Sequence, residues 1–148
     1  MKNLPDKKRL LINFSMCKNW EEKYLYIIDL GYLLPTFPEK MRIDQYLVPG
    51  CQSQVWIVVL IEIIQYKRVV RFYGDSDALI VKGLIAIIFI IYKDKDLQEI
   101  VNLDIREILK LLELDKYLTS FRIQGINSIL NAIHNQITVL NNGNEIKF

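Results

Sequence analysis

One β-hairpin pattern lies in the middle of this 148-residue chain, and it limits the architectures that the chain can adopt. Residues 54–64 are rich in Val and Ile, residues 65–68 interrupt this run, and residues 69–73 resume it. Two runs of β-branched and aromatic residues around a short polar break predict two antiparallel strands. Residues 46–48 predict a further short strand, so we expect a sheet of about three strands.

Helical patterns precede the hairpin. A first helix is predicted to open at Pro5 and Asp6, because proline fits the first turn and an acid there favours the helix dipole. This helix should end near residues 16–17. Asn19 is a favourable N-cap for a second amphipathic helix that ends near residues 31–32. Residues 34–42 contain two prolines and predict a loop.

Further helical patterns follow the hairpin. Ser76 or Asp77 can cap an apolar helix over residues 78–92. Capping-box patterns at residues 96–99 and 104–107 predict helices over residues 97–101 and 105–114. A last helix starts after Ser120 and has one apolar face as far as Ile137. We expect the Asn-Asn-Gly sequence at residues 141–143 to end it and the tail after about residue 141 to be frayed.

Helices on both sides of one hairpin predict an α+β fold, in which helices cover one face of a small antiparallel sheet. The length and the 51% of hydrophobic residues suit one packed core, so we expect a single domain over residues 1–148. A parallel doubly wound sheet would require strands and helices to alternate, and this chain shows no such alternation.

Composition narrows the classes of partner. A formal net charge of +2, with 24% charged residues of both signs, does not suit a nucleic-acid binder. The most apolar run, residues 83–92, is about half of the ~20 residues that a membrane span needs. Residues 1–8 are polar rather than a basic start before an apolar run, so we expect a cytoplasmic protein whose Cys17 and Cys51 are free thiols.

Few residues could carry chemistry. His134 is the only histidine, and a lone helical histidine is most often structural. The nucleophile elbow, the phosphate-binding loop, the dinucleotide fingerprint and the zinc-protease motif are all missing from the sequence. Two distant cysteines do not form a metal-ligand pair, and Asp75 and Asp77 lack the spacing of a calcium loop. We therefore expect no resident metal or cofactor.

Cys51 is the strongest candidate for a functional residue. It follows Gly50, which permits a sharp turn, and precedes the polar residues 52–54. Without a histidine base, acyl transfer is disfavoured, whereas sulfur exchange needs only a thiolate and a sulfur to attack. The alternative is that Cys51 serves only as a small apolar residue at the start of a strand. Cys17 is expected to be a buried structural thiol.

Several motifs occur together in the order that they have in a known family. They are Asn19-Trp20-Glu21-Glu22-Lys23-Tyr24, Gly50-Cys51-Gln52-Ser53-Gln54-Val55-Trp56, Gly74-Asp75-Ser76-Asp77-Ala78 with Ile80-Val81-Lys82-Gly83-Leu84, and Arg122 with Gln124-Gly125. With these motifs, the chain from residue 4 to about residue 135 resembles the SufE family of sulfur-acceptor proteins.

The resemblance implies a sulfur acceptor and activator for the cysteine desulfurase SufS. SufS would use its own pyridoxal phosphate to take sulfur from cysteine and hold it as a persulfide. Cys51 would accept that sulfur, become a persulfide itself, and pass the sulfur to the SufBCD scaffold for iron–sulfur cluster assembly. The implied α+β fold, shared with IscU-type scaffolds, agrees with the fold predicted from the element order.

The resemblance also implies roles for the neighbours of Cys51. Gly50, Gln52, Gln54 and Trp56 would shape a loop that holds the cysteine against apolar side chains. Pro49 and a longer hairpin over residues 61–71 depart from the family pattern, as does the tail past residue 141. Pro49 would affect the flexibility of this loop, whereas the other two lie away from the sulfur path.

Two further positions have a functional and a structural interpretation. Asp77 resembles an acidic position that supports the buried loop, and its alternative role is helix capping. Arg122 resembles a basic position that contacts the partner, and its alternative is a surface salt bridge.

The sequence leaves several alternatives open. The chain could be a CsdE-like partner of a different desulfurase, using the same cysteine. It could also be a structural adaptor that binds the desulfurase complex without carrying sulfur. A monomer and a homodimer are both compatible with the sequence.

Overall fold

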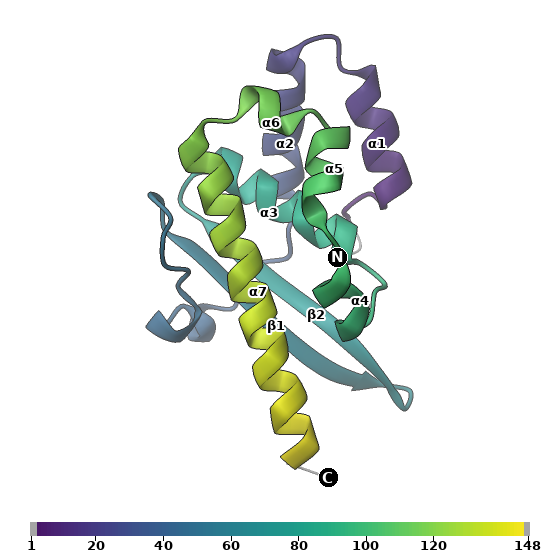
Figure 1. Ribbon diagram of the computed structural model, residues 1–148, viewed down its shortest axis with the longest axis vertical. Helices are drawn as coiled ribbons and strands as arrows, with labels where there is room; N and C mark the ends of the chain where they lie inside the picture. The colour runs from purple at the N-terminus through teal and green to yellow at the C-terminus, as the bar shows by residue number, and fades with distance from the viewer. Residues whose placement is uncertain (1–2, 147–148) are drawn as a thin grey trace.

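The computed structural model describes the backbone of residues 3–146 and the side chains of residues 3–142 (Figure 1). In chain order the elements are α1 (Lys7–Met16), α2 (Trp20–Tyr32), the 3₁₀ turns η1 (Glu39–Met41) and η2 (Asp44–Tyr46), β1 (Val55–Ile64), β2 (Lys67–Ser76), α3 (Leu79–Tyr92), α4 (Leu97–Asn102), α5 (Ile105–Leu111), α6 (Leu114–Tyr117) and α7 (Ser120–Ile146). Within these residues, helices lie on both sides of one hairpin, which confirms the α+β prediction.

β1 and β2 form one antiparallel hairpin, in a register that places Ile64 opposite Lys67. Residues 65 and 66 form the turn, and their φ angles are 51° and 67°. Two consecutive positive φ angles are the requirement of a type I′ turn, whose twist matches that of the strands. The position of the hairpin in the chain is therefore as the sequence predicts.

The predicted third strand does not join the sheet. Leu47 forms an isolated bridge with Trp56, and the Val48 N–H donates to the Val55 carbonyl oxygen at 2.8 Å. The ladder cannot extend further, because η2 precedes this bridge and Pro49, which has no N–H, follows it. The sheet of the described residues thus has two strands rather than about three.

β2 extends beyond the predicted run of residues 69–73 at both ends, from Lys67 to Ser76. Gly74 belongs to the strand and lies directly against α3. A Cβ at this position would lie 2.6 Å from Ile85 Cγ2 and 3.0 Å from Phe89 Cζ. Glycine here permits the close approach of helix and strand.

α3 and α7 pack against the hairpin, and α7 crosses in front of it in Figure 1. The Phe72 ring of β2 stacks on Phe89 of α3, with 5.1 Å between ring centroids. On the opposite face, Val58 is fully buried and the Trp56 ring lies 6.5 Å from Phe37. The connection between α2 and β1 therefore covers part of the second face.

α7 also closes one edge of the hairpin. Gln136 Nε2 donates to the Ile57 carbonyl oxygen, and Gln136 Oε1 accepts from the Val59 N–H, both at 2.8 Å. A single side chain thereby replaces the two hydrogen bonds that a neighbouring strand would supply. The buried residues around this contact form one hydrophobic cluster that extends from Leu4 to Ile137.

α3 contains the most apolar run of the chain, and residues 83–92 are all buried. Among the described residues, no helix is both long enough and apolar enough to cross a membrane. α2 crosses α3 at Gly31 and Gly83, where the backbones nearly touch. A Cβ at Gly31 would lie 2.8 Å from the Gly83 nitrogen, and one at Gly83 would overlap the Ile27 carbonyl oxygen.

Helix starts agree with the sequence pattern better than helix ends do. Asp6 and Asn19 cap α1 and α2, and residues 96–99 form the predicted capping box of α4. The helix predicted over residues 105–114 is instead α5 and α6, separated by Glu113 with a φ of 57°.

α7 runs to Ile146 rather than ending at residues 141–143. Asn and Gly weaken a helix but do not by themselves end one, which is why this predicted end is wrong. The last two residues of the predicted frayed tail, 147 and 148, lie outside the described residues.

Gly83→Ala tests the α2–α3 crossing. We expect the free energy of unfolding to fall by about 3 kcal/mol or more, because the added methyl group meets rigid backbone rather than a movable side chain. Urea unfolding followed by circular dichroism measures the change. Gly125→Ala is the matched control: its Cβ would make only an ordinary contact, 3.9 Å from Cys51 Sγ. Equal stability of the two variants would contradict the packing described.

Candidate functional site

The loop that carries Cys51 joins the Leu47 bridge to the start of β1. Gly50 has a φ of +84°, a conformation that residues with a side chain rarely adopt. A Cβ at Gly50 would also lie 2.9 Å from Ser128 Oγ of α7. Both the backbone conformation and the space available therefore require glycine immediately before the cysteine.

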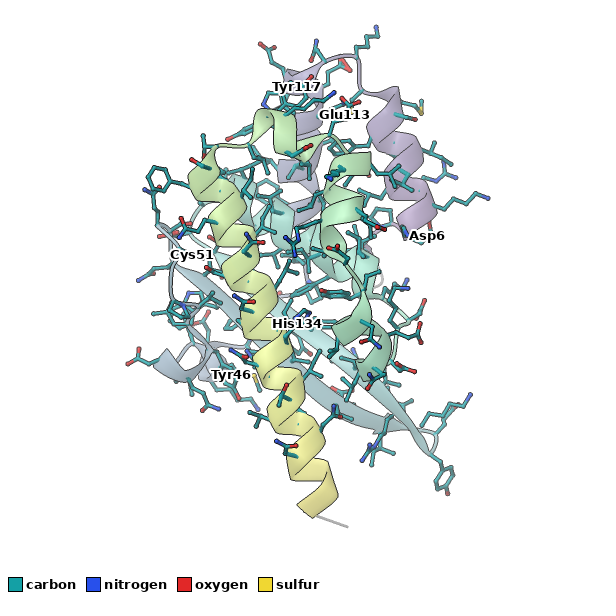
Figure 2. All side chains as sticks on the ribbon, viewed as in Figure 1. Asp6, Tyr46, Cys51, Glu113, Tyr117 and His134 are labelled. Carbon is teal, nitrogen blue, oxygen red and sulfur yellow. The ribbon has the colours of Figure 1, made fainter. Side chains whose placement is uncertain are left out.

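Cys51 packs against the N-terminal half of α7, as Figure 2 shows. The side chain is half-buried, and its thiol donates a long hydrogen bond to the Gly125 carbonyl oxygen, with 3.8 Å between sulfur and oxygen. Gly125 itself has no side chain, and a Cβ there would lie 3.9 Å from the sulfur. The thiol thus rests on exposed backbone of α7 and contributes to the edge of the hydrophobic core.

Burial raises the pKa of the Cys51 thiol, and no neighbouring charge contributes to the shift. A buried thiolate loses hydration without gaining a cationic partner, so the neutral thiol is favoured. At neutral pH the folded chain therefore holds less of Cys51 as the reactive thiolate than an exposed cysteine would.

His134 does not supply a base for this thiol. It lies nine residues beyond Gly125 on the same helix, about 13 Å along the axis. Burial lowers its pKa, and its Nε2 atom is buried without a hydrogen-bond partner among the described residues. Figure 2 shows His134 farther along α7 than Cys51.

Asp77 holds the end of the Cys51 loop rather than capping α3. Its Oδ1 accepts from the Gln54 N–H at 3.0 Å, while the Ser76 hydroxyl donates to the Gln54 carbonyl oxygen at 2.8 Å. The N-cap of α3 is Ala78, which provides no side-chain cap. The prediction that residue 76 or 77 caps α3 holds for Ser76 only in part. Besides donating to Gln54, the Ser76 hydroxyl accepts from the Ala78 N–H at the start of the helix, at 3.2 Å, whereas the Asp77 side chain is used by the loop.

The other predicted site residues are more scattered. Gln52 is exposed, and Trp56 lies within β1 with its ring against Phe37 rather than against the thiol. Arg122 lies in the first turn of α7, and its side chain forms no ion pair within the described residues. The structure thus brings together Gly50, Cys51 and the backbone of residue 54. The side chains of Gln52, Trp56 and Arg122 lie apart from this group.

Ser128 is a neighbour of the loop that the sequence does not suggest. It lies 78 positions after Gly50, and no spacing rule connects a serine within a helix to a distant glycine turn.

Arg42 is a second residue that the sequence does not reveal. It forms ion pairs with Glu39 at 3.0 Å and Asp75 at 2.9 Å, and its guanidinium lies 4.9 Å from the Phe37 ring and 5.6 Å from the Trp56 ring. Arg42 therefore ties the connection between α2 and β1 to the end of β2, next to the strand that follows the Cys51 loop.

The described residues contain no group of three or more His, Cys, Asp or Glu side chains placed to hold a metal ion. The fold and the site define an α+β protein in which the half-buried thiol of Cys51 has no histidine to assist it. Such a site suits sulfur exchange, in which thiolates are both nucleophile and leaving group.

Comparison with known proteins agrees with that class. The SufE family profile, described as an Fe-S metabolism associated domain, matches residues 8–137. A curated relative from Wigglesworthia glossinidia brevipalpis, "Cysteine desulfuration protein SufE", is 53% identical over 117 residues, 79% of each chain. The chain therefore belongs to the SufE family.

The fold also has a solved neighbour. The solution structure of a hypothetical protein from Thermus thermophilus matches with a TM-score of 0.66. The match covers 88% of this chain and 92% of the other at 19% sequence identity, so it supports the fold alone.

The raised pKa of Cys51 predicts a pH profile. In a Cys17→Ser background, the rate of alkylation by iodoacetamide should rise at a higher pH in the folded protein than in the same protein unfolded in urea. Between the pKa of Cys51 in the unfolded chain and its higher pKa in the folded chain, the thiol is ionised mainly in the unfolded chain. Rising pH through this range should therefore also lower the free energy of unfolding. A folded profile that rises at lower pH than the unfolded one would contradict the described surroundings.

Asp77→Ala tests the anchor of the loop. Loss of the acceptor for the Gln54 N–H should raise the alkylation rate of Cys51 by about fivefold, the factor that corresponds to ~1 kcal/mol from one hydrogen bond. Mass spectrometry of the alkylated chain measures the rate. Asp29→Ala, an exposed change on α2, is the control and should leave it unchanged; equal rates in the two variants would show that Asp77 does not hold the loop.

Proposed function

We propose that this protein is the sulfur acceptor and activator of the cysteine desulfurase SufS, with Cys51 as the sulfur-carrying residue. The observation that carries the proposal is the placement of Cys51, which rests half-buried against Gly125 on a glycine-dependent turn. Membership of the SufE family and the name of the curated relative support desulfuration as the process.

The transfer step is a thiol exchange. The Cys51 thiolate attacks the outer sulfur of a persulfide on the desulfurase, and a bond forms between the two sulfur atoms. The bond between the outer sulfur and the desulfurase cysteine breaks, and that cysteine leaves as a thiolate. The outer sulfur is then the terminal atom of a Cys51 persulfide, and no oxidant or reductant is needed.

The surroundings of Cys51 support a carrier rather than a stand-alone enzyme. The raised pKa favours the neutral thiol in the free protein, so docking that exposes the sulfur or brings a cation to it would promote attack. The same burial would shield a persulfide from solvent and oxidants between partners. Removal of sulfur would also free the desulfurase for its next turnover, which is the activating role.

The remaining parts of the pathway belong to other proteins. Pyridoxal phosphate would be held by SufS and not by this chain. The Cys51 persulfide would pass its sulfur to the SufBCD scaffold for iron–sulfur cluster assembly. We propose the cytoplasm as the compartment, where thiols remain reduced.

Two alternatives make different predictions. A CsdE-like protein would use the same cysteine with another desulfurase, whereas an adaptor would bind a desulfurase without carrying sulfur. No described contact favours either of them over the SufS carrier.

Intact mass measurement separates the carrier from the adaptor. After incubation with SufS and cysteine, the protein should gain the mass of one sulfur atom under non-reducing conditions and lose it on addition of dithiothreitol. Cys51→Ser should gain nothing. Cys17→Ser is the matched control and should load normally, because Cys17 lies at the end of α1 with its thiol bonded to the Asn13 carbonyl oxygen. Binding of SufS without any mass gain would contradict a carrier function and support the structural adaptor instead.

A further inference from the structure

Each strand of the hairpin has an outer edge, and the two edges differ in how many of their backbone groups have hydrogen-bond partners. On β1, the Val55 carbonyl oxygen accepts from Val48, and the Ile57 carbonyl oxygen and Val59 N–H bond to Gln136. The edge of β1 near Cys51 is therefore satisfied by the rest of the fold.

The register shows which groups face outward on β2. In an antiparallel pair, two opposite residues either bond to each other or both turn their N–H and C=O groups away. The Val59 N–H points away from β2, so the N–H and C=O groups of Phe72, which lies opposite Val59, point away from β1. Two residues along the ladder, the same holds for Val70, which lies opposite Ile61. Among the described residues, none forms a hydrogen bond with the backbone of Val70 or Phe72 outside the hairpin.

A groove of about 1090 Å³ follows this open edge. One wall consists of residues 67–73 of β2, and the other consists of residues 92–98, from the end of α3 to the start of α4. The apolar lining of the groove includes Val70, Phe72 and Leu97. From β1, only Ile61 is among the described lining residues. The groove therefore lies on the β2 side of the hairpin, where an additional strand would pair.

The rim of this groove is cationic. Lys67, Lys93 and Lys95 line it and form no ion pair within the described part of the chain. Arg68 and Arg71 line it too, the latter paired with Glu62. Asp94 and Asp96 are the acidic lining residues, and Asp96 is engaged as the N-cap of α4. The excess of positive charge favours an acidic ligand.

We propose that the open edge of β2 binds an extended acidic segment of a partner protein by strand addition. Backbone hydrogen bonds to Val70 and Phe72 would hold the segment as a third strand, and its acidic side chains would meet the lysines of the rim. A second copy of this chain is a poorer occupant, because it would bring its own lysines to the same edge.

This surface is separate from the sulfur site. Cys51 precedes the start of β1, and Val70 lies opposite Ile61, about 20 Å farther along the hairpin. A segment bound here could tether a partner without covering the thiol. The inference goes beyond sulfur transfer, since binding at β2 does not depend on the chemistry of Cys51.

Val70→Pro is the direct test. The Val70 N–H points outward, so proline removes a donor to the added strand without breaking a bond to β1. The probe is a fluorescein-labelled nine-residue peptide of alternating Glu and Val, and anisotropy measures its binding. We expect binding to the native protein with a Kd tighter than about 1 mM, and weakening by about tenfold in Val70→Pro. Val70→Ala keeps the N–H and loses only part of the apolar lining, so it should weaken binding less than Val70→Pro does.

Two further measurements test strand addition at β2 even if the proline variant folds poorly. Lys93→Glu with Lys95→Glu should weaken the same peptide, and added salt should do so in the native protein. NMR of the native protein should show the Val70 and Phe72 amides protected from hydrogen exchange when the peptide is bound. Absence of binding, equal binding to Val70→Pro and Val70→Ala, or amide changes confined to the Cys51 loop would each overturn strand addition at β2.

Discussion

The packing of α7 against β1 is the contact on which both the sheet and the Cys51 loop depend. Near the middle of the helix, Gln136 bonds to the backbone of Ile57 and Val59 and closes the edge of the strand. Near its start, Gly125 and Ser128 form the wall against which the Cys51 loop rests. One helix therefore holds a two-stranded sheet that would be marginal alone and sets the depth of the thiol.

The depth of Cys51 has opposing consequences. Burial shields the sulfur but disfavours the thiolate, and no cation or histidine of this chain offsets that cost. Under the proposed function, such a site would hold sulfur more readily than it would take sulfur unaided. Activation by a docked partner would resolve this conflict, because a few hydrogen bonds, including the one from Gln54 to Asp77, hold the loop in place. A site of this kind separates storage from transfer.

Local features of the fold were predictable, and distant pairings were not. The cap at Asn19, the capping box at residues 96–99 and the hairpin depend on residues a few positions apart, so spacing rules identify them. Gln136 meets β1 across more than 70 residues, and no local pattern reveals such a contact. Elimination of other chemistries and the family motifs predict Cys51 as the functional residue, but only the structure shows its burial against α7. Asp77 shows the same limit: its spacing suggests a cap, whereas the tertiary fold uses it to anchor the loop.

The most direct test of sulfur carriage by Cys51 is a single-turnover transfer from SufS loaded with radiolabelled sulfur. Samples quenched over time and digested would show where the label resides and how fast it moves. If Cys51 carries the sulfur, the label should reach the peptide containing Cys51 at least as fast as the desulfurase turns over, and a thiol reductant should release it. Label that stays on SufS, or reaches this chain more slowly than turnover, would contradict sulfur carriage by Cys51.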